Sequence, residues 1–356
     1  MSSDPDRFWG DDKMRSPFRT RQTEIRSQHS AKGRLEEERG EESGRGREAD
    51  KPGDIPSAGW KDVLLRVKSR IPEHHLSIIA AGTAFYGLLA SFPALTALFG
   101  LYALAVDGRQ IYEHLSSLKE ELSPDALRLF LALVEALAQS NRWRLGLGIG
   151  AGILFTLWGA SLGIRALMSA LNVTYEEREE RSFVVRMALA SLLTIGAICV
   201  ASLVIAAVIG VPVAIQLLPL DPLLHALLVY ARWPIVAAMF WLSLLVMYRY
   251  GPSRTLARWS WVSWGAFVAT ALWLCGSGLI SWYVVNFGGY NKVYGSVGLI
   301  VILLLWFLVS AFCVLLGAEI NAELERQTRK DTTVGERKPL GERGAKVADT
   351  IGKATK

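Results

Sequence analysis

The stretch GTAFYGLLASFPALTALF, residues 82–99, decides the fold. It is uncharged and long enough to cross a bilayer, because a run of about 18 apolar residues is typical of a transmembrane helix. It nevertheless contains two threonines, a tyrosine, a serine and a proline. At about 100° per residue, Thr83, Gly87 and Ser91 fall in one sector with several alanines, and Tyr86 lies at its edge. Large apolar residues fill most of the opposite side.

This division predicts a helix whose large face meets lipid and whose small, polar face meets other helices. Pro93 removes one backbone hydrogen bond near the middle and predicts a kink. Thr96 and Leu98 do not follow the division. The polar sector lines either a tight helix contact, which is the more common use of small residues in membranes, or a cavity.

Five further apolar runs of membrane-spanning length follow along the chain. The 356 residues are 51% hydrophobic, a figure that only suggests a membrane protein, but the apolar residues are concentrated after residue 76. The sequence therefore predicts an all-α, polytopic membrane protein with six transmembrane helices. The expected spans are Ser77–Val106, Leu145–Leu171, Met187–Leu218, Leu223–Met247, Val262–Val285 and Val297–Ala318.

The distribution of Lys and Arg in the short loops predicts the orientation, since these residues favour the cytoplasmic side. Both termini are expected in the cytoplasm, because the second and fourth loops and the start of the C-terminal tail are rich in arginine. The first outer loop, Asp107–Arg144, mixes five basic with six acidic residues. Its Ser123-Pro124-Asp125 begins an expected amphipathic helix that lies on the outer surface, or that forms a lid over an outward cavity.

The regions that flank the spans have a different composition. Residues 1–56 and 328–356 are polar and highly charged, which predicts disordered tails around a membrane domain at 57–327. A basic amphipathic helix containing Trp60 and Val67 precedes the first span, and we expect it to lie in the membrane interface, held by anionic lipids. No clustered basic surface on a folded module is visible, so the chain is not expected to bind nucleic acid.

Charged residues within the spans are the next candidates for function, because they are unfavourable in lipid and are often functional. Arg165 and Glu319 are expected near the cytoplasmic boundary, where they could pair, although Arg165 could instead snorkel and Glu319 could end its helix in solvent. Arg232, in the fourth span, lines an outward cavity or snorkels outward. Polar residues at a depth similar to that of Glu319 could form a cluster at the cytoplasmic mouth: Asn172, Tyr175 and Asn321.

Several of these stretches resemble the YihY/virulence factor BrkB family of bacterial inner-membrane proteins. The matching pieces are AAGTAFYGLLASFPAL (80–95), WGASLGIRALMSALNVTYEEREER (158–181), YRYGPSRTLARWSWVSWGA (248–266) and YNKVYGSVGLIVILLLWFLVSAFCVLLGAEINAELE (290–325). The resemblance covers about residues 60–327, and the GAEINAELE block is its most specific part. It implies six transmembrane helices in the cytoplasmic (inner) membrane. Members are linked to virulence and envelope resistance, and some carry the name ribonuclease BN, but the resemblance implies no settled activity.

The residues give little support to an enzyme. The five histidines lie in different segments, no P-loop or GxGxxG motif occurs, and the cysteines have no metal-ligand spacing, so we expect no catalytic site, metal or cofactor. Two hypotheses remain. In the first, the chain transports a lipid or another envelope amphiphile, or controls permeability to it, as the polar-sided first span and the intramembrane charges suggest. In the second, the chain is a structural scaffold of the cell envelope, as the scarcity of acidic residues in the spans suggests.

Overall fold

The computed structural model describes residues 44–105, 145–210, 221–287 and 296–354. The regular elements in these ranges are helices, with a single isolated β-bridge between Ala257 and Thr333. The long helices are α2 (Ser57–Glu73), α3 (Leu76–Ala105), α6 (Leu145–Thr174), α7 (Phe183–Ile205), α9 (Pro222–Tyr250), α10 (Trp259–Phe287) and α12 (Ser296–Glu325). A short 3-10 helix, η1 (Pro52–Asp54), precedes α2, and a π-turn, η3 (Ala206–Gly210), extends α7. The expected outer-loop helix lies outside the described residues.

The helical class and the membrane character are confirmed. Five helical stretches of the described residues are long and apolar enough to cross a membrane: Leu76–Ala94, Phe183–Val208, Tyr230–Tyr250, Trp259–Asn286 and Ile300–Glu325. The remaining predicted span corresponds to α6, a helix of 30 residues whose first ten side chains are not described. Six spans therefore stay a prediction.

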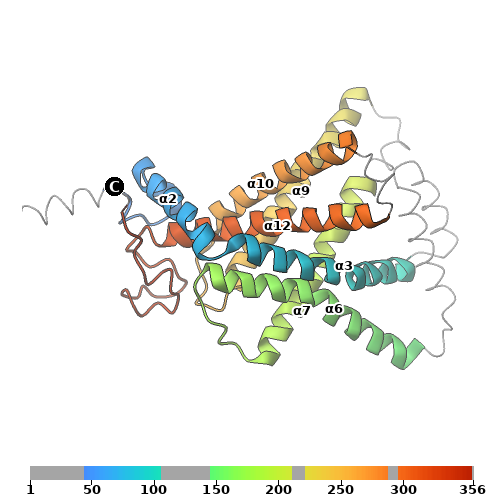
Figure 1. Ribbon diagram of the computed structural model, residues 1–356, viewed down its shortest axis with the longest axis horizontal. Helices are drawn as coiled ribbons and strands as arrows, with labels where there is room; N and C mark the ends of the chain where they lie inside the picture. The colour runs from blue at the N-terminus through green and yellow to red at the C-terminus, as the bar shows by residue number, and fades with distance from the viewer. Residues whose placement is uncertain (1–43, 106–144, 211–220, 288–295, 355–356) are drawn as a thin grey trace, which may run out of the picture.

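Helix α12 runs through the middle of the bundle and packs against α2, α3, α6 and α10 (Figure 1). Its contact with α10 is very close, because a Cβ on Gly265 would collide with the carbonyl oxygen of Gly317. Asn321 holds the same contact by accepting from the Gly265 amide at 2.8 Å and donating to the Val262 carbonyl at 3.2 Å. The small residues and the amide thus fix α10 on α12.

The second close contact joins α3 to α6 and follows the small sector of α3. A Cβ on Gly163 would lie 3.4 Å from both the Gly87 Cα and the Ala90 Cβ, and one on Gly159 would lie 3.0 Å from the Pro93 ring. Phe85 and Phe92 are exposed on the opposite side, as expected of a lipid-facing surface. Helix α3 continues through Pro93 without a break.

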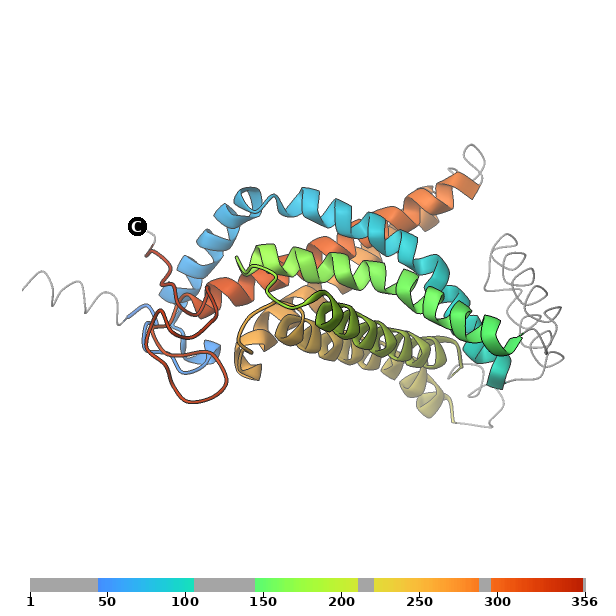
Figure 2. The ribbon, with the colours of Figure 1, turned by 90° about the horizontal axis from the view of Figure 1, so that it is seen from below.

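The loops that join α6 to α7 and α9 to α10 lie at one end of the bundle, together with α2 and residues 326–354 (Figures 1 and 2). We call it the α2 end. Helices α3, α7 and α10 begin there, and α6, α9 and α12 end there. A helix of 30 residues is about 45 Å long, so α3, α6 and α12 exceed the thickness of a hydrocarbon core.

Helix α2 packs on the protein more closely than expected of an interfacial helix. Its Val63 and Val67 are buried against Trp261, Ile320 and Leu324 of α10 and α12. Its arginines, which we expected to contact anionic lipids, instead point to α12, where the Arg66 Nε lies 2.5 Å from the Glu323 carboxylate. The chain then turns into α3 through His75, whose φ of 50° lies in the left-handed region.

The C-terminal segment, residues 326–354, differs from the disordered tail expected from composition. Arg343 is almost fully buried and donates to four main-chain carbonyls, those of Arg329, Lys330, Lys338 and Ala348. The end of the expected N-terminal tail is also packed, since Arg47 donates to the Gly352 carbonyl at 2.7 Å. Composition predicts disorder because these segments contain many charged residues, whereas Arg343 and Arg47 are buried and donate hydrogen bonds to main-chain carbonyls.

Candidate functional site

A groove of about 500 Å³ lies between α3 and α6 and reaches the first turn of α7. Its lining includes Ile79, Thr83 and Tyr86 of α3, Leu162, Arg165 and Ser169 of α6, and Arg186 of α7. We call it the α3–α6 groove. It brings together three residues that the sequence singled out, Thr83, Tyr86 and Arg165, whereas Gly87 and Pro93 lie in the helix contact beside it.

The groove begins where the close contact between α3 and α6 ends, beyond Gly163 and Gly87, and the two helices leave space between them. A Cβ on Gly82 would meet no atom within 4 Å, so this turn of α3 leaves space beside α6. Thr83 donates its hydroxyl to the Ile79 carbonyl at 2.9 Å, and Ser91 likewise donates to Leu88 at 2.6 Å. Both hydroxyls thus donate their hydrogen bonds to carbonyls of their own helix. The tyrosine and the arginines are the lining side chains best placed to contact a ligand.

Arg165 lies along its own helix, toward the start of α6 and away from the α2 end. Its guanidinium donates to the carbonyls of Ser161 at 3.4 Å and Trp158 at 3.2 Å, four and seven residues earlier in α6, and it lies over the Trp158 ring. Because α6 ends at the α2 end, an arginine that snorkelled to that surface would extend the other way. The guanidinium is therefore held away from the α2 end.

Arg186 provides a second cation nearer the α2 end. Its Nη2 donates to the Ser169 hydroxyl at 2.9 Å, and that hydroxyl donates to the Arg165 carbonyl at 3.0 Å. With a rise of 1.5 Å per residue, Arg186 lies about 5 Å from the start of α7 and Arg165 about 14 Å from the end of α6. The two cations thus occupy successive depths along one groove.

No acidic residue occurs among the described residues that line the groove. The nearest carboxylate to Arg186 is that of Glu179, 4.0 Å from its Nε. Glu179 is already bound by Arg181 at 2.7 Å and by the Asn172 amide at 3.1 Å. The groove is therefore a mainly apolar surface with an excess of positive charge.

A different arrangement occurs beyond the groove, where acidic and basic residues neutralise one another. Glu323 of α12 pairs with Arg66, Arg70 and Arg326. Glu176, in the loop after α6, lies 2.7 Å from Arg326 and 3.1 Å from Lys346 of the C-terminal segment. Partial burial opposes ionisation of Glu176, but the hydrogen bonds and charges of these basic groups outweigh it and lower its pKa to about 2.

Glu319 has a different partner from the expected one. His74, the residue that ends α2, hydrogen-bonds through Nδ1 to the Glu319 carboxylate at 3.0 Å, and this bond raises the pKa of His74. Arg165 and Glu319 share no ion pair among the described residues, since Arg165 donates to carbonyls of its own helix. The Glu319 side chain is fully buried, so it joins α12 to the turn between α2 and α3 rather than ending its helix in solvent.

The other polar residues predicted for the cytoplasmic mouth join helix ends and loops to one another. Asn172 accepts from the Ser253 amide at 2.8 Å and so ties the end of α6 to the loop after α9. Tyr175 is buried, burial raises its pKa, and its ring lies 4.3 Å from the Arg254 guanidinium. Arg254 in turn makes a two-armed ion pair with Glu325, at 2.6 and 3.1 Å.

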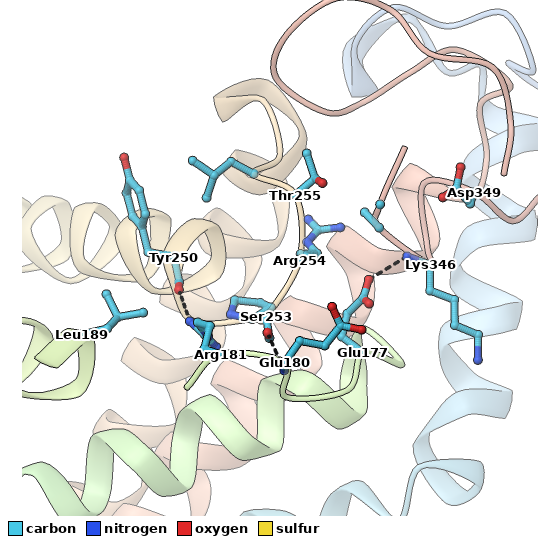
Figure 3. Close-up of a pocket in the computed structure, with 14 residues that line it drawn as sticks. Glu177, Glu180, Arg181, Leu189, Tyr250, Ser253, Arg254, Thr255, Lys346 and Asp349 are labelled. Carbon is cyan, nitrogen blue, oxygen red and sulfur yellow. Dashed lines mark hydrogen bonds between the residues drawn. The ribbon is translucent and has the colours of Figure 1, made fainter. Parts of the chain in front are cut away.

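A larger cavity, of about 760 Å³, lies at the α2 end between the loops after α6 and α9 and the C-terminal segment (Figure 3). Figure 3 shows that several polar groups of its lining are hydrogen-bonded to one another. Arg181 donates to the Tyr250 carbonyl, Ser253 accepts from the Glu180 amide, and Glu177 accepts from the Lys346 amide. These groups hold the loops to one another.

Arg232 lies apart from both hollows. It donates to the Val208 carbonyl in the π-turn after α7 at 3.2 Å and lies over the Trp233 ring. Among the residues that the structure describes, no group of three His, Cys, Asp or Glu side chains is placed to hold a metal ion.

Sequence reasoning missed Arg186, the His74–Glu319 contact and the role of the C-terminal segment. Arg186 could have been noticed, because it is a basic residue in the first turn of an apolar helix. The other contacts join residues that are more than 160 positions apart, for which a single sequence contains no periodic signal.

The comparison with known protein families decides the family. The model of the virulence factor BrkB family matches residues 67–340, most of the chain. The chain belongs to this family. It is 29% identical over 276 residues to YfkH of Bacillus subtilis (strain 168), a protein named as ribonuclease-like, and this match covers 75% of the chain and 96% of YfkH.

Other family relatives are named only as membrane proteins. A UPF0761 membrane protein of Haemophilus influenzae (strain 86-028NP) is 24% identical over 74% of the chain and 96% of its own length. One of Idiomarina loihiensis is 27% identical over 50% of the chain and 61% of its own length. No solved structure matches the chain. The family and the apolar helices together make this chain a multi-pass bacterial membrane protein.

Proposed function

We propose that this BrkB-family protein binds a membrane amphiphile in the α3–α6 groove and helps its polar head to move through the bilayer. The observation that carries the proposal is Arg165, whose guanidinium is directed along α6 away from the α2 end, beside an open, mainly apolar surface. In the six-span arrangement that we propose below, this position lies within the membrane. An arginine in this position is unfavourable unless it is paired or hydrated, and such residues commonly mark the path of a polar substrate.

We also propose the membrane and the orientation in which this happens. The α2 end faces the cytoplasm and the protein lies in the bacterial inner membrane, with six spans and both termini inside. The support is the number of arginines at the α2 end, in the loops and at the start of the C-terminal segment: Arg178, Arg181, Arg254, Arg258, Arg326 and Arg329. Positive residues in short loops favour the cytoplasmic side.

The role that we propose is not enzymatic. The ribonuclease-like name belongs to the Bacillus relative, and the sequence here has no P-loop. Its GASLG stretch (159–163) matches the GxSxG pattern, but it lies inside α6, where Ser161 donates to the Trp158 carbonyl at 2.7 Å, and not at a strand-to-helix turn. The second candidate function is a structural scaffold of the envelope. The ion-paired surface of the α2 end favours it, because Glu176 and Glu323 already fix several segments in one arrangement.

The experiment that tests the proposal fills the groove. Gly82→Trp places a large side chain in the open part of the groove, and Gly278→Trp is the matched control, since both glycines have open space around them and Gly278 is exposed on α10. Each protein is released from membranes in gentle detergent and examined by native mass spectrometry, and each is reconstituted into liposomes that contain a fluorescent phospholipid.

We expect the unaltered protein and Gly278→Trp to retain lipid and to accelerate exchange of the fluorescent lipid between leaflets, and Gly82→Trp to lose both. The proposal would be refuted if the unaltered protein exchanged the fluorescent lipid no faster than protein-free liposomes do and its mass spectrum showed no bound lipid. A stably retained partner protein in that case would favour the scaffold.

A further inference from the structure

We propose that the ligand of the α3–α6 groove is an anionic phospholipid, whose headgroup phosphate is bound between Arg165 and Arg186. The inference rests on the proposed function for the location of the ligand and adds its chemical class. Both side chains line the same groove, whose described lining contains no carboxylate, and Glu179, 4.0 Å from the Arg186 Nε, is shared with Arg181.

The two guanidinium groups lie at successive positions along α6, that of Arg186 beside Ser169 and that of Arg165 beside the Ser161 and Trp158 carbonyls. The Ser169 hydroxyl, one turn after Arg165, receives a hydrogen bond from the Arg186 Nη2 and donates one to the Arg165 carbonyl. Each guanidinium has five N–H groups. Arg165 directs donors to two carbonyls, and Arg186 directs one to the serine, so both keep N–H groups for a phosphate. Planar guanidinium groups match phosphate oxygens in two-armed pairs.

The surrounding charges favour a net-negative head over a zwitterionic one. Glu179 is the acidic residue nearest to Arg186, and its oxygens are taken up by Arg181 and Asn172. A choline head would bring a second cation beside two arginines, whereas a phosphatidylglycerol head brings only the negative phosphate. Because the groove lies among membrane-spanning helices, these charges act in a medium of low dielectric constant, where they are strong.

The walls of the groove fit a lipid rather than a free anion. Ile79, Leu162 and Val173 provide apolar surface for an acyl chain, and Tyr86, which is 45% exposed, provides an aromatic face beside it. Val173 and Ser169 are exposed at the edge, so the groove is open along its side. An amphiphile can therefore bind with its head between the arginines and its chain in the membrane.

The depths of the arginines suggest the order in which they act. Arg186 lies in the first turn of α7, near the α2 end, and its partner Ser169 lies one turn closer to that end than Arg165 does. A headgroup phosphate can bind Arg186 first, at the membrane surface, and then move along the groove to Arg165. The pair provides a stepwise path for a charged head into the bilayer.

The test compares retention of two lipids with the same acyl chains, phosphatidylglycerol and phosphatidylcholine. The full chain is purified from liposomes that contain equal amounts of both, and the lipids that remain bound are measured by mass spectrometry. We expect phosphatidylglycerol to be preferred by about tenfold, as one charge-assisted contact would give. We expect Arg165→Gln and Arg186→Gln each to remove most of this preference, and Arg165→Lys to keep part of it.

Two controls make the result decisive. Arg178→Gln removes an exposed cation from the neighbouring loop and should leave the preference unchanged. Retained phosphatidylcholine in the same sample reports whether each variant still folds and binds lipid. Excess inorganic phosphate should not displace the lipid, and displacement would show that the free anion suffices and would overturn the assignment of a lipid.

Equal retention of the two lipids by the unaltered protein would overturn the inference. If Gly82→Trp then still abolished retention and exchange, the proposed function would stand and only the chemical class would fail. Loss of preference in Arg178→Gln as strong as in Arg165→Gln would likewise overturn the inference, since it would reveal a general surface charge effect.

Discussion

The ion pair between Arg254 and Glu325 allows a quantitative test of what holds the α2 end together. Both side chains are fully buried, and the two guanidinium nitrogens lie 2.6 and 3.1 Å from the two carboxylate oxygens. Thr332 of the C-terminal segment donates its hydroxyl to the same carboxylate at 2.8 Å. The pair therefore links the loop after α9, the end of α12 and the C-terminal segment.

Removing one partner should be far more harmful than removing both. Arg254→Met leaves the Glu325 carboxylate buried with a single hydroxyl, and loss of one partner of a buried pair destabilises by about 3–5 kcal/mol. Replacing both partners with apolar residues leaves no buried charge, so Arg254→Met combined with Glu325→Leu should cost about 0–2 kcal/mol.

The assay is reversible unfolding of the detergent-solubilised protein by increasing SDS, followed by the fluorescence of its 12 tryptophans. Arg178→Met is the control, because it removes an exposed arginine with the same substitution and should change stability by less than about 0.5 kcal/mol. If Arg254→Met equalled this control, or if the double variant lost the sum of the two single losses, the pair would not be coupled as the structure indicates.

Three further results are expected. Gly87→Leu should destabilise by about 1–3 kcal/mol or more in the same assay, because even its Cβ would lie 3.2 Å from the Phe307 ring; unchanged stability would mean that α3 does not pack closely there. His74→Gln should lower the unfolding temperature more at pH 6 than at pH 9, because the bond to Glu319 raises the His74 pKa above 6.5, so its stabilisation is complete below pH 6.5 and is lost as pH rises through the raised pKa; an equal lowering at both pH values would argue against the pair. Arg343→Ala should make the C-terminal segment sensitive to trypsin, since four main-chain carbonyls lose their donor, and a digestion rate equal to that of the unaltered protein would contradict this packing.

The sequence was most informative where one physical property repeats along a helix. The spans follow from the length of apolar runs, and the small sector of α3 follows from its helical period, because lipid and a neighbouring helix select different side chains on opposite faces. Gly87 and Phe85 are thus found at the helix contact and at the exposed face respectively.

The sequence was least informative where charged residues meet across the fold. His74 and Glu319 are 245 positions apart, and Arg66 and Glu323 are 257 positions apart, so no local pattern pairs them. The C-terminal segment shows the same limit. Its composition is that of a solvated tail, yet the backbone carbonyls around Arg343 supply the partners that make burial favourable.

The direction of the Arg165 side chain has a consequence for the bilayer itself. A guanidinium that is held inward cannot reach the surface, so water and lipid heads must move toward it, and a charge within the core is commonly accommodated by local thinning of the membrane. The leaflet beside α6 should therefore be dented. In such a dent the hydrocarbon barrier is lower for every neighbouring lipid, so the lipid movement that we propose would require no source of metabolic energy.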